Sequence, residues 1–203
     1  MKVKLSQGEL KRQRDALRQF ERYLPTLQLK KQQIQLEILH HQAFLKEAKD
    51  ALSRKMKAAT EWSALLAEDP GIGRWLVPKN VVRGKKNVAG VDLPVFERAE
   101  FETAMYDLFL EPLWIDRGIE ALREIVSLQE EIRILEEGIS ILNHDLRITT
   151  QRVNLFEKVK IPEAKEAIRL IKIHLGDQMT NAVGRSKIAK KKIEAAAAME
   201  RGA

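Results

Sequence analysis

The side chains best suited to chemistry in this sequence are its histidines and a run of glutamates. The four histidines are His40, His41, His144 and His174. On a helix His40 and His41 point about 100° apart, so they lack the i, i+4 spacing of a metal-ligand pair, and we interpret His41 as a polar layer of a coiled coil. The glutamates Glu130, Glu131, Glu136 and Glu137 lie at helical spacing between the apolar residues of a helix, which indicates a solvated helix face. The sequence therefore predicts no catalytic residue and no metal site.

The sequence also gives no sign of a cofactor-binding motif. The stretch VRGKKNVAG lacks both the spacing and the hydroxyl residue of a G-x-x-x-x-G-K-[ST] phosphate loop. The chain has no cysteine, which excludes disulfides and thiolate metal sites. Trp62, Trp75 and Trp114 are expected to serve as packing residues. We expect neither a bound cofactor nor an enzymatic activity.

Long helices dominate the expected structure, because 32% of the residues are charged and only 5% are aromatic. Apolar residues recur every seven positions in two arms, which predicts coiled-coil strands. The first seam contains Leu10, Leu17, Leu24, Lys31, Ile38, Leu45 and Leu52, with Phe20, Leu27, Ile34, His41 and Ala48 at the companion position. The second contains Ile125, Ile132, Ile139, Leu146 and Val153, with Leu128, Leu135, Leu142, Thr149 and Phe156.

Proline and glycine interrupt the helix between these arms. Residues 68–96 hold three of the six prolines and four of the ten glycines. Within them KNVVR and NVAGVDL are β-branched runs separated by Gly84 and two lysines, which predicts a small hairpin over residues 79–93. The following stretch FERAEFETAMYDLFL predicts a short helix.

Two arms with one interruption most simply fold back on each other. The predicted fold is mainly all-α: a long antiparallel coiled coil of the N- and C-terminal helices, with a small middle region that contains the hairpin and the short helix. The expected segments are residues 1–69, 70–111 and 112–203. Pairing residues whose numbers sum to 180 sets Ile38 opposite Leu142, and sums of 173 or 187 satisfy the heptads equally well.

Prolines stand inside both predicted arms. Apolar positions resume after Pro162, at Ala164, Ile168, Ile171, Leu175 and Met179. We therefore expect helices that bend at Pro25 and Pro162 and continue beyond them.

Charge is segregated along the chain. Residues 1–58 hold 14 Lys and Arg against 6 Asp and Glu, residues 92–137 hold 4 against 13, and residues 151–203 hold 12 against 6. Two basic arms flank an acidic middle, and the net charge of +7 alone does not choose among nucleic acid, anionic lipid and an acidic protein cavity as partners.

A resemblance to a known family narrows these choices. QRVNLFEKVKIPEAKEAIRLIKIHLGDQ followed by RSKIAKKK is similar to the C-terminal signature of the D subunits of the rotary V/A-type ATPases and ATP synthases. RYLPTLQLKKQQIQLE resembles the bacterial branch of that family, and NVAGVDLPVF resembles its middle segment.

The resemblance implies a central-stalk rotor shaft that couples ATP synthesis or hydrolysis to translocation of H⁺ or Na⁺. The implied partners are the catalytic and regulatory A and B subunits of a ring, the small F subunit of the stalk and a subunit that couples to the membrane rotor. Neither nucleotide nor nucleic acid is expected to bind directly. Seven basic residues are expected to face the ring: Arg12, Arg14, Arg185, Lys187, Lys190, Lys191 and Lys192.

The hairpin and the acidic segment from Glu97 to Glu111 are expected to contact the small stalk subunit or to modulate the ATPase rate. The hairpin residues concerned are Lys79, Val81, Val82, Arg83, Lys85, Lys86, Val88 and Val91.

Two other function classes remain open from the residues. A basic coiled-coil scaffold that binds nucleic acid is the main rival, since the calculated pI is about 9.6. The other is an amphipathic protein lying on anionic membranes, although the apolar seam is narrow, as for helix pairing. No run approaches 18 apolar residues and the first residues lack an apolar signal core, so we expect no membrane insertion. The resemblance implies a cytoplasmic protein held peripherally at the membrane by its complex.

Overall fold

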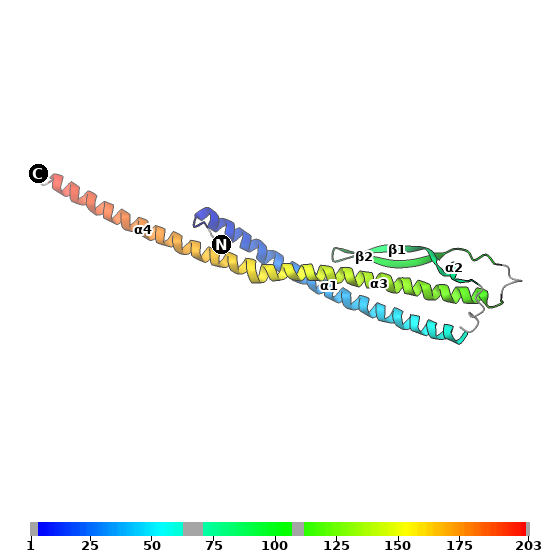
Figure 1. Ribbon diagram of the computed structural model, residues 1–203. Coiled ribbons are helices and arrows are strands. Elements are labelled where there is room, and N and C mark those ends of the chain that lie inside the picture. Colours follow the sequence, from blue (N-terminus) through cyan, green and yellow to red (C-terminus); the bar gives the residue numbers. More distant parts are fainter. Residues whose placement is uncertain (1–3, 63–70, 107–111, 202–203) are drawn as a thin grey trace. The chain divides into compact units, whose positions relative to one another are not determined.

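The computed structural model describes residues 4–62, 71–106 and 112–201 (Figure 1). Its elements are α1 (Gln7–Trp62), α2 (Gly73–Leu76), β1 (Pro78–Val88), β2 (Val91–Phe101), α3 (Ile115–Leu155), the π-helical turn η2 (Phe156–Lys160) and α4 (Ile161–Arg201). The chain divides into two compact units, residues 1–28 with 151–203 and residues 29–150. The mainly all-α prediction with one antiparallel hairpin is confirmed.

In the unit of residues 29–150, α1 and α3 pair through the predicted seams. Ile34, Ile38 and Leu142 lie in one buried cluster, with exposed fractions of 0%, 7% and 0%. His41 is buried and faces Gly138, where an added Cβ would stand 3.7 Å from the imidazole Cδ2. These contacts agree with the antiparallel register in which paired residue numbers sum to about 180. The heptads are compatible with sums of 173, 180 and 187, and the observed contacts select the sum near 180.

The hairpin is longer than predicted, and its turn lies elsewhere. Strands β1 and β2 pair in antiparallel fashion from Val88 and Val91 to Pro78 and Phe101. The expected break at Gly84 and the two lysines is wrong, because Gly84 pairs within the ladder. Ala89 and Gly90 form the turn instead, with φ values of 51° and 77°. Positive φ at both central positions matches the twist of the strands.

The predicted helix in FERAEFETAMYDLFL is wrong over residues 96–101, which belong to β2, and over residues 102–106, which are in neither helix nor strand. This stretch contains good helix formers, but residues 78–83 of β1 pair with residues 96–101 and hold them in a strand. Glu97 is the extra residue of a bulge, since Arg83 pairs with Phe96 and Val82 with Arg98. Residues 107–110 of the predicted helix lie outside the described residues.

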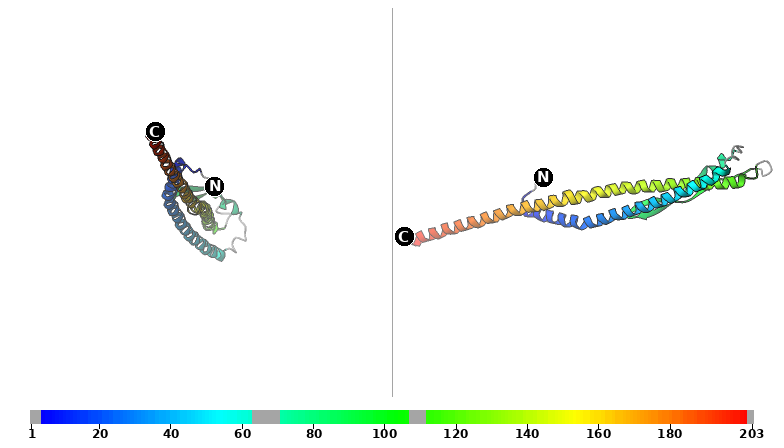
Figure 2. Two further views of the ribbon diagram at one scale, coloured as in Figure 1. Left: turned by 90° about the vertical axis from the view of Figure 1, so that its left-hand side faces the viewer. Right: turned by 90° about the horizontal axis from the view of Figure 1, so that it is seen from below.

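The hairpin packs on the helix pair inside this same unit. Figures 1 and 2 show it running alongside α3. Val91 and Leu93 join the cluster of Ile34, Ile38 and Leu142, and Leu93 is 1% exposed. The tip of the hairpin therefore forms part of the core of this unit, with both helices beneath it.

In the other unit, the start of α1 packs on η2 and α4. The Phe20 and Phe156 ring centroids lie 5.3 Å apart, and Lys165 Nζ lies 3.3 Å from Glu21 Oε1. The predicted apolar pattern after Pro162 is buried as far as Ile171, which is 0% exposed. Met179 is 62% exposed because α4 extends past the start of α1 (Figure 1).

Both prolines lie within helices that continue, as predicted. Pro25 is inside α1, and the hydroxyl of Thr26 donates to the carbonyl of Tyr23 at 2.8 Å. Before Pro162 the chain widens into η2, where the Ile161 N–H donates to the Phe156 carbonyl five residues back. This wider turn accommodates a ring that would otherwise collide with the Lys158 carbonyl. The bends at Pro25 and Pro162 stay a prediction.

Within the described residues no helix is both long and apolar enough to cross a membrane.

Candidate functional site

The seven basic residues expected to face a ring are all exposed, and they lie in two groups along one unit. Arg12 and Arg14 are on α1, and the other five are on α4 between Arg185 and Lys192. In the antiparallel register Arg12 lies level with about residue 168, so Arg185 is roughly 25 Å further along the axis at 1.5 Å per residue. The structure therefore arranges the predicted residues in series and does not gather them in one cluster.

These cations have few partners among the described residues. Arg12 lies 3.8 Å from Glu9, and Lys190 lies 3.7 Å from Glu194, with side chains of the two cations about four-fifths exposed. Exposed ion pairs of this kind contribute little, so these side chains stay mobile and available to an external anionic surface. The end of α4 also exposes Val183, Ile188 and Ile193. This segment combines apolar and cationic residues on a helix that no other described element covers (Figure 1).

Several predicted hairpin residues are already engaged within the chain. Val88 and Val91 pack against the helix-pair cluster. Arg83 donates to Glu137 on α3 at 3.1 Å, and Lys86 lies 3.5 Å from Glu37 on α1. The hairpin is thus tied to both helices, and Lys85 is among the hairpin side chains left exposed toward a partner. Three glutamates of the 130–137 run form ion pairs: Glu130 with Arg133, Glu136 with Lys49 and Glu137 with Arg83.

The acidic segment is described only in part. Glu100 accepts hydrogen bonds from Arg98 at 2.8 and 3.0 Å, and Glu102 lies 3.5 Å from Lys79. The hydrogen bond from Arg98 lowers the pKa of the Glu100 carboxyl below its ordinary value. Residues 107–111, which complete the predicted segment, lie outside the described residues.

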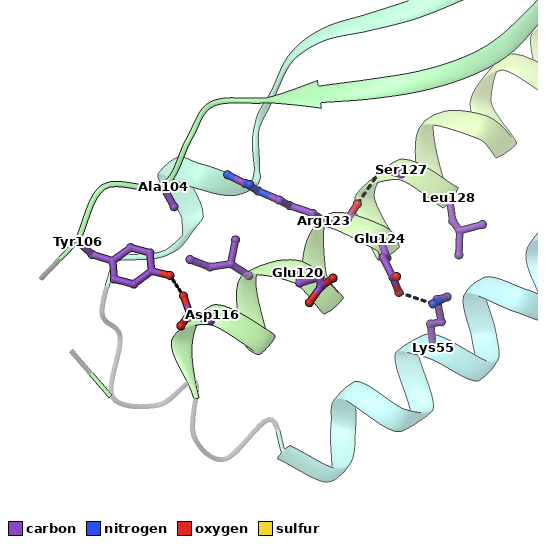
Figure 3. Close-up of a pocket in the computed structure, with 10 residues that line it drawn as sticks. Lys55, Ala104, Tyr106, Asp116, Glu120, Arg123, Glu124, Ser127 and Leu128 are labelled. Carbon is purple, nitrogen blue, oxygen red and sulfur yellow. Dashed lines mark hydrogen bonds and ion pairs between the residues drawn. The ribbon is translucent and has the colours of Figure 1, made fainter. Parts of the chain in front are cut away.

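A cavity of about 580 Å³ opens where α3 begins (Figure 3). Four of its polar side chains form two pairs: the Tyr106 hydroxyl donates to Asp116, and Lys55 donates to Glu124. Tyr106 also packs on Trp75, with ring centroids 5.3 Å apart. Trp75 is 7% exposed, which confirms its predicted packing role. These contacts hold the middle region against α3 and assemble no set of nucleophile, base and acid among the residues that line the cavity.

Arg123 is a residue of this cavity that the sequence analysis did not single out. Its guanidinium donates to the Trp75 carbonyl at 3.0 Å and to the Glu102 carbonyl, and it lies 5.1 Å from the Phe101 ring centroid. One side chain of α3 thereby holds both ends of the middle region. No local sequence signal marks such a residue, because its acceptors are backbone carbonyls 48 and 21 residues away.

We expect Arg123→Ala to lower the free energy of unfolding by about 1–3 kcal/mol, because two carbonyls lose their donor and the Phe101 ring loses its cation. Urea denaturation followed by circular dichroism measures this change. The exposed Arg117→Ala serves as the matched control and is expected to cost less than about 0.5 kcal/mol. Equal effects of the two substitutions would contradict this role of Arg123.

Glu166 on α4 titrates below the ordinary range for a glutamate. The hydrogen bond from Arg169, which is 2.7–2.8 Å long, lowers the pKa of the Glu166 carboxyl, and the positive charge of Arg169 acts in the same direction. Because the folded pKa is depressed, the small stabilisation is present above the unfolded pKa and is lost as pH falls through the folded pKa. Carboxyl NMR should show the pKa of Glu166 rising in Arg169→Gln and unchanged in Lys172→Gln.

Comparison with known proteins gives these surfaces a context. The sequence model of the family described as the ATP synthase D subunit matches residues 9–191. That range contains α1 from Glu9 onward, the hairpin, α3 and most of α4.

Individual relatives agree along nearly their whole length. The protein named as the D subunit of the V-type ATP synthase from Borreliella burgdorferi is 46% identical over 190 residues, which cover 93% of this chain and 94% of that protein. A protein of the same name from Chlamydia pneumoniae is 32% identical over 201 residues, with 96% and 94% covered.

Proposed function

Because the chain belongs to the family of ATP synthase D subunits, we propose that it is the central-stalk rotor shaft of a V-type ATP synthase. In this role it is a non-catalytic subunit that couples ATP synthesis or hydrolysis in a catalytic ring to translocation of H⁺ or Na⁺. The observation that carries the proposal is the family match over residues 9–191, which spans both long helical arms. The protein would then lie peripherally at the cytoplasmic face of the membrane, held there by its complex.

Paired helices suit a part that transmits torque. Two helices locked by interdigitating seam residues resist twisting better than one helix does. In residues 29–150 the hairpin adds contacts to both helices, through Arg83 with Glu137 and Lys86 with Glu37. We infer that this unit is the stiffer part of the shaft.

An asymmetric shaft also explains how rotation could change nucleotide affinity elsewhere. Inside a ring of A and B subunits it would present a different set of side chains to each catalytic interface, so each interface would bind nucleotide with a different affinity. Turning the shaft would permute these affinities. The exposed cations of α4 suit a bearing surface because mobile, weakly paired charges create no single deep energy minimum.

Purification of the tagged chain from its native lysate at low salt tests this function. We expect the A and B subunits of the ring, the small F subunit of the stalk and the membrane-rotor coupling subunit to co-purify, together with ATP hydrolysis. Recovery of nucleic acid without these subunits would contradict the shaft and favour the nucleic-acid-binding scaffold. If the protein is a nucleic-acid-binding scaffold, its affinity for nucleic acid should fall steeply as the salt concentration rises, because many contacts to phosphates depend on salt together.

We assign the exposed face of the hairpin, which includes Lys79 and Lys85, to contact with the small stalk subunit or to modulation of the ATPase rate. Lys79→Glu with Lys85→Glu changes this face while leaving Val91 and Leu93 in the core. The double variant is expected to change the affinity for the small stalk subunit or the ATPase rate roughly fivefold, since reversing two rim charges costs about 1 kcal/mol.

Titration calorimetry with the purified small stalk subunit and a steady-state ATPase assay measure the two possible effects. Lys46→Glu with Lys57→Glu makes the same charge change on the exposed side of α1 and serves as the control. If the hairpin variant behaves like this control in both assays, the hairpin assignment is wrong.

A further inference from the structure

Glu37 of α1 stands among three basic side chains at the place where the hairpin tip meets the helix pair. Its carboxylate lies 3.5 Å from Lys86 Nζ, 3.6 Å from His41 Nδ1 and 3.7 Å from His40 Nδ1. The Glu37 side chain is only 16% exposed, so water and salt screen these interactions weakly. Two of the three basic groups are histidines, whose ordinary charge change falls between pH 5 and pH 8.

The buried ring of His41 is held in its neutral form by the seam. Its Nδ1 lies 3.1 Å from the Glu37 carbonyl, which can only accept, so Nδ1 carries the proton of the neutral ring. The edge with Cδ2 and Nε2 faces Gly138 of α3. A second proton would therefore create a positive charge inside a buried layer, and that charge would compete with Lys86 for the Glu37 carboxylate beside both groups.

Charges across the contact between hairpin and helices are balanced while the histidines are neutral. The hairpin contributes the cations Arg83 and Lys86, which pair with Glu137 of α3 and Glu37 of α1. Protonation of both histidines would add two positive charges to the helix side and offset its two carboxylates. A helix surface that attracts the cationic hairpin would then cease to do so.

The other charged groups of these three elements leave this balance unchanged. Each either has a separate partner or is exposed to water: Asp92 accepts a hydrogen bond from Asn87, Asp145 pairs with Lys30, Glu136 pairs with Lys49, and Lys85 and His144 are exposed.

The hairpin depends on its contact with the helices for stability. A two-stranded hairpin is marginally stable by itself in water. Its turn adds a cost, because Ala89 adopts a φ of 51°, which is unfavourable for a residue other than glycine. Val91 and Leu93 hold the tip in the apolar cluster, and the Lys86–Glu37 pair reinforces that attachment from β1. Loss of the ion pair should thus loosen the tip without unfolding the helices.

We propose that Glu37, His40, His41 and Lys86 form a pH-sensitive switch that fastens the hairpin tip to the helix pair. Neutral histidines leave Glu37 to Lys86, and protonated histidines take that carboxylate and repel the lysine. Attachment is favoured above the pH range in which the histidines titrate and is weakened as pH falls through that range, because the loosened state binds more protons. The switch does not depend on the shaft function, whereas its use in changing an ATPase rate would rest on the role proposed for the hairpin.

Hydrogen exchange of the full chain at pH 7.5 and pH 5.5, read by mass spectrometry and corrected for intrinsic exchange rates, tests this inference. Protection of residues 84–94 is expected to fall about fivefold or more at pH 5.5, while α3 around Leu128 keeps its protection. Carboxylates ordinarily titrate near pH 4, so histidines are the main groups that change charge in this interval. An equal loss in α3, or unchanged or increased protection of the hairpin, would overturn the inference.

The four histidines of the chain supply a variant and its matched control. His40→Gln with His41→Gln should reduce the difference in hairpin protection between the two pH values to less than about twofold. His144→Gln with His174→Gln removes the same number of titrating groups and should keep the response of the parent chain. A full response in the first variant would show that these two histidines do not control the hairpin.

Substitution of the lysine tests the same contact without altering the buried layer. Lys86→Gln should lower hairpin protection at pH 7.5 to about the level of the parent chain at pH 5.5, with little further loss on acidification. Lys85→Gln removes an exposed cation from the same hairpin and should behave like the parent chain. If the two lysine variants respond alike, the Lys86–Glu37 pair is not part of a switch. All these measurements use the isolated chain, so their outcome is separate from recovery of a catalytic ring.

Discussion

Neutralising the seven basic residues predicted to face the catalytic ring is expected to weaken assembly with that ring at least tenfold and to reduce the dependence of assembly on salt. The substituted residues are Arg12, Arg14, Arg185, Lys187, Lys190, Lys191 and Lys192, each changed to Gln. Seven exposed ion pairs at roughly 0.2–1 kcal/mol each correspond to a tenfold or larger change in affinity. Glutamine keeps the helix propensity and much of the length of the side chain, so the change is mainly one of charge.

A charge-matched control separates a bearing surface from a general electrostatic effect. Seven other exposed cations provide it, all but the last in the unit of residues 29–150: Lys46, Arg54, Lys57, Arg117, Arg133, Arg147 and Arg152. Either set of substitutions lowers the formal net charge from +7 to zero. The measurements are ring affinity at several salt concentrations and the coupling of ATPase activity to rotation.

The comparison has a clear outcome in each direction. If the terminal residues face the ring, the first variant binds the ring more weakly, and its affinity changes less with salt concentration. The control keeps the affinity and the salt dependence of the parent chain, because salt screens the charges that form the contact. If the two variants keep the same salt sensitivity and coupling as the parent chain, these residues do not form the bearing surface.

Leu142→Ala is expected to lower the free energy of unfolding by about 2–5 kcal/mol. Leu142 is 0% exposed and lies where α1, α3 and the hairpin tip meet, in the cluster of Ile34, Ile38 and Leu93. Truncation removes apolar contacts and leaves a cavity that three separate elements would have to move to fill. Urea denaturation of the full chain, followed by circular dichroism, measures the loss.

Leu36→Ala is the matched control because the same atoms are removed from a side chain that is 58% exposed. We expect it to change the free energy of unfolding by less than about 0.5 kcal/mol. A loss of similar size in both variants would show that burial at the junction of helices and hairpin is not what makes Leu142 important.

Amide hydrogen exchange locates the effect of Leu142→Ala within the fold. Protection should fall both in α1 around Ile38 and in β2 around Leu93, since both belong to the cluster that this side chain fills. Loss confined to α3 would contradict the shared cluster.

Local, repeated patterns were enough to predict the helices and their pairing. A heptad places two core residues in every two turns, so the seam from Ile34 to Ala48 and its antiparallel partner could be identified without any tertiary information. Continuation of α4 past Pro162 was predictable in the same way, because apolar positions resume at Ala164 and Ile168. The basic residues were found by type alone, and the family resemblance suggested their role.

Non-local contacts decided the rest. The turn at Ala89 and Gly90, and the strand that replaced a predicted helix over residues 96–101, depend on which partner each strand pairs with. Arg123 acts through backbone carbonyls far away in sequence. The sequence by itself determined which residues must be buried, because hydrophobic periodicity follows from local helix geometry. Only the tertiary structure decided what covers them, because the hairpin tip reaches Ile38 and Leu142 through contacts that no local pattern encodes.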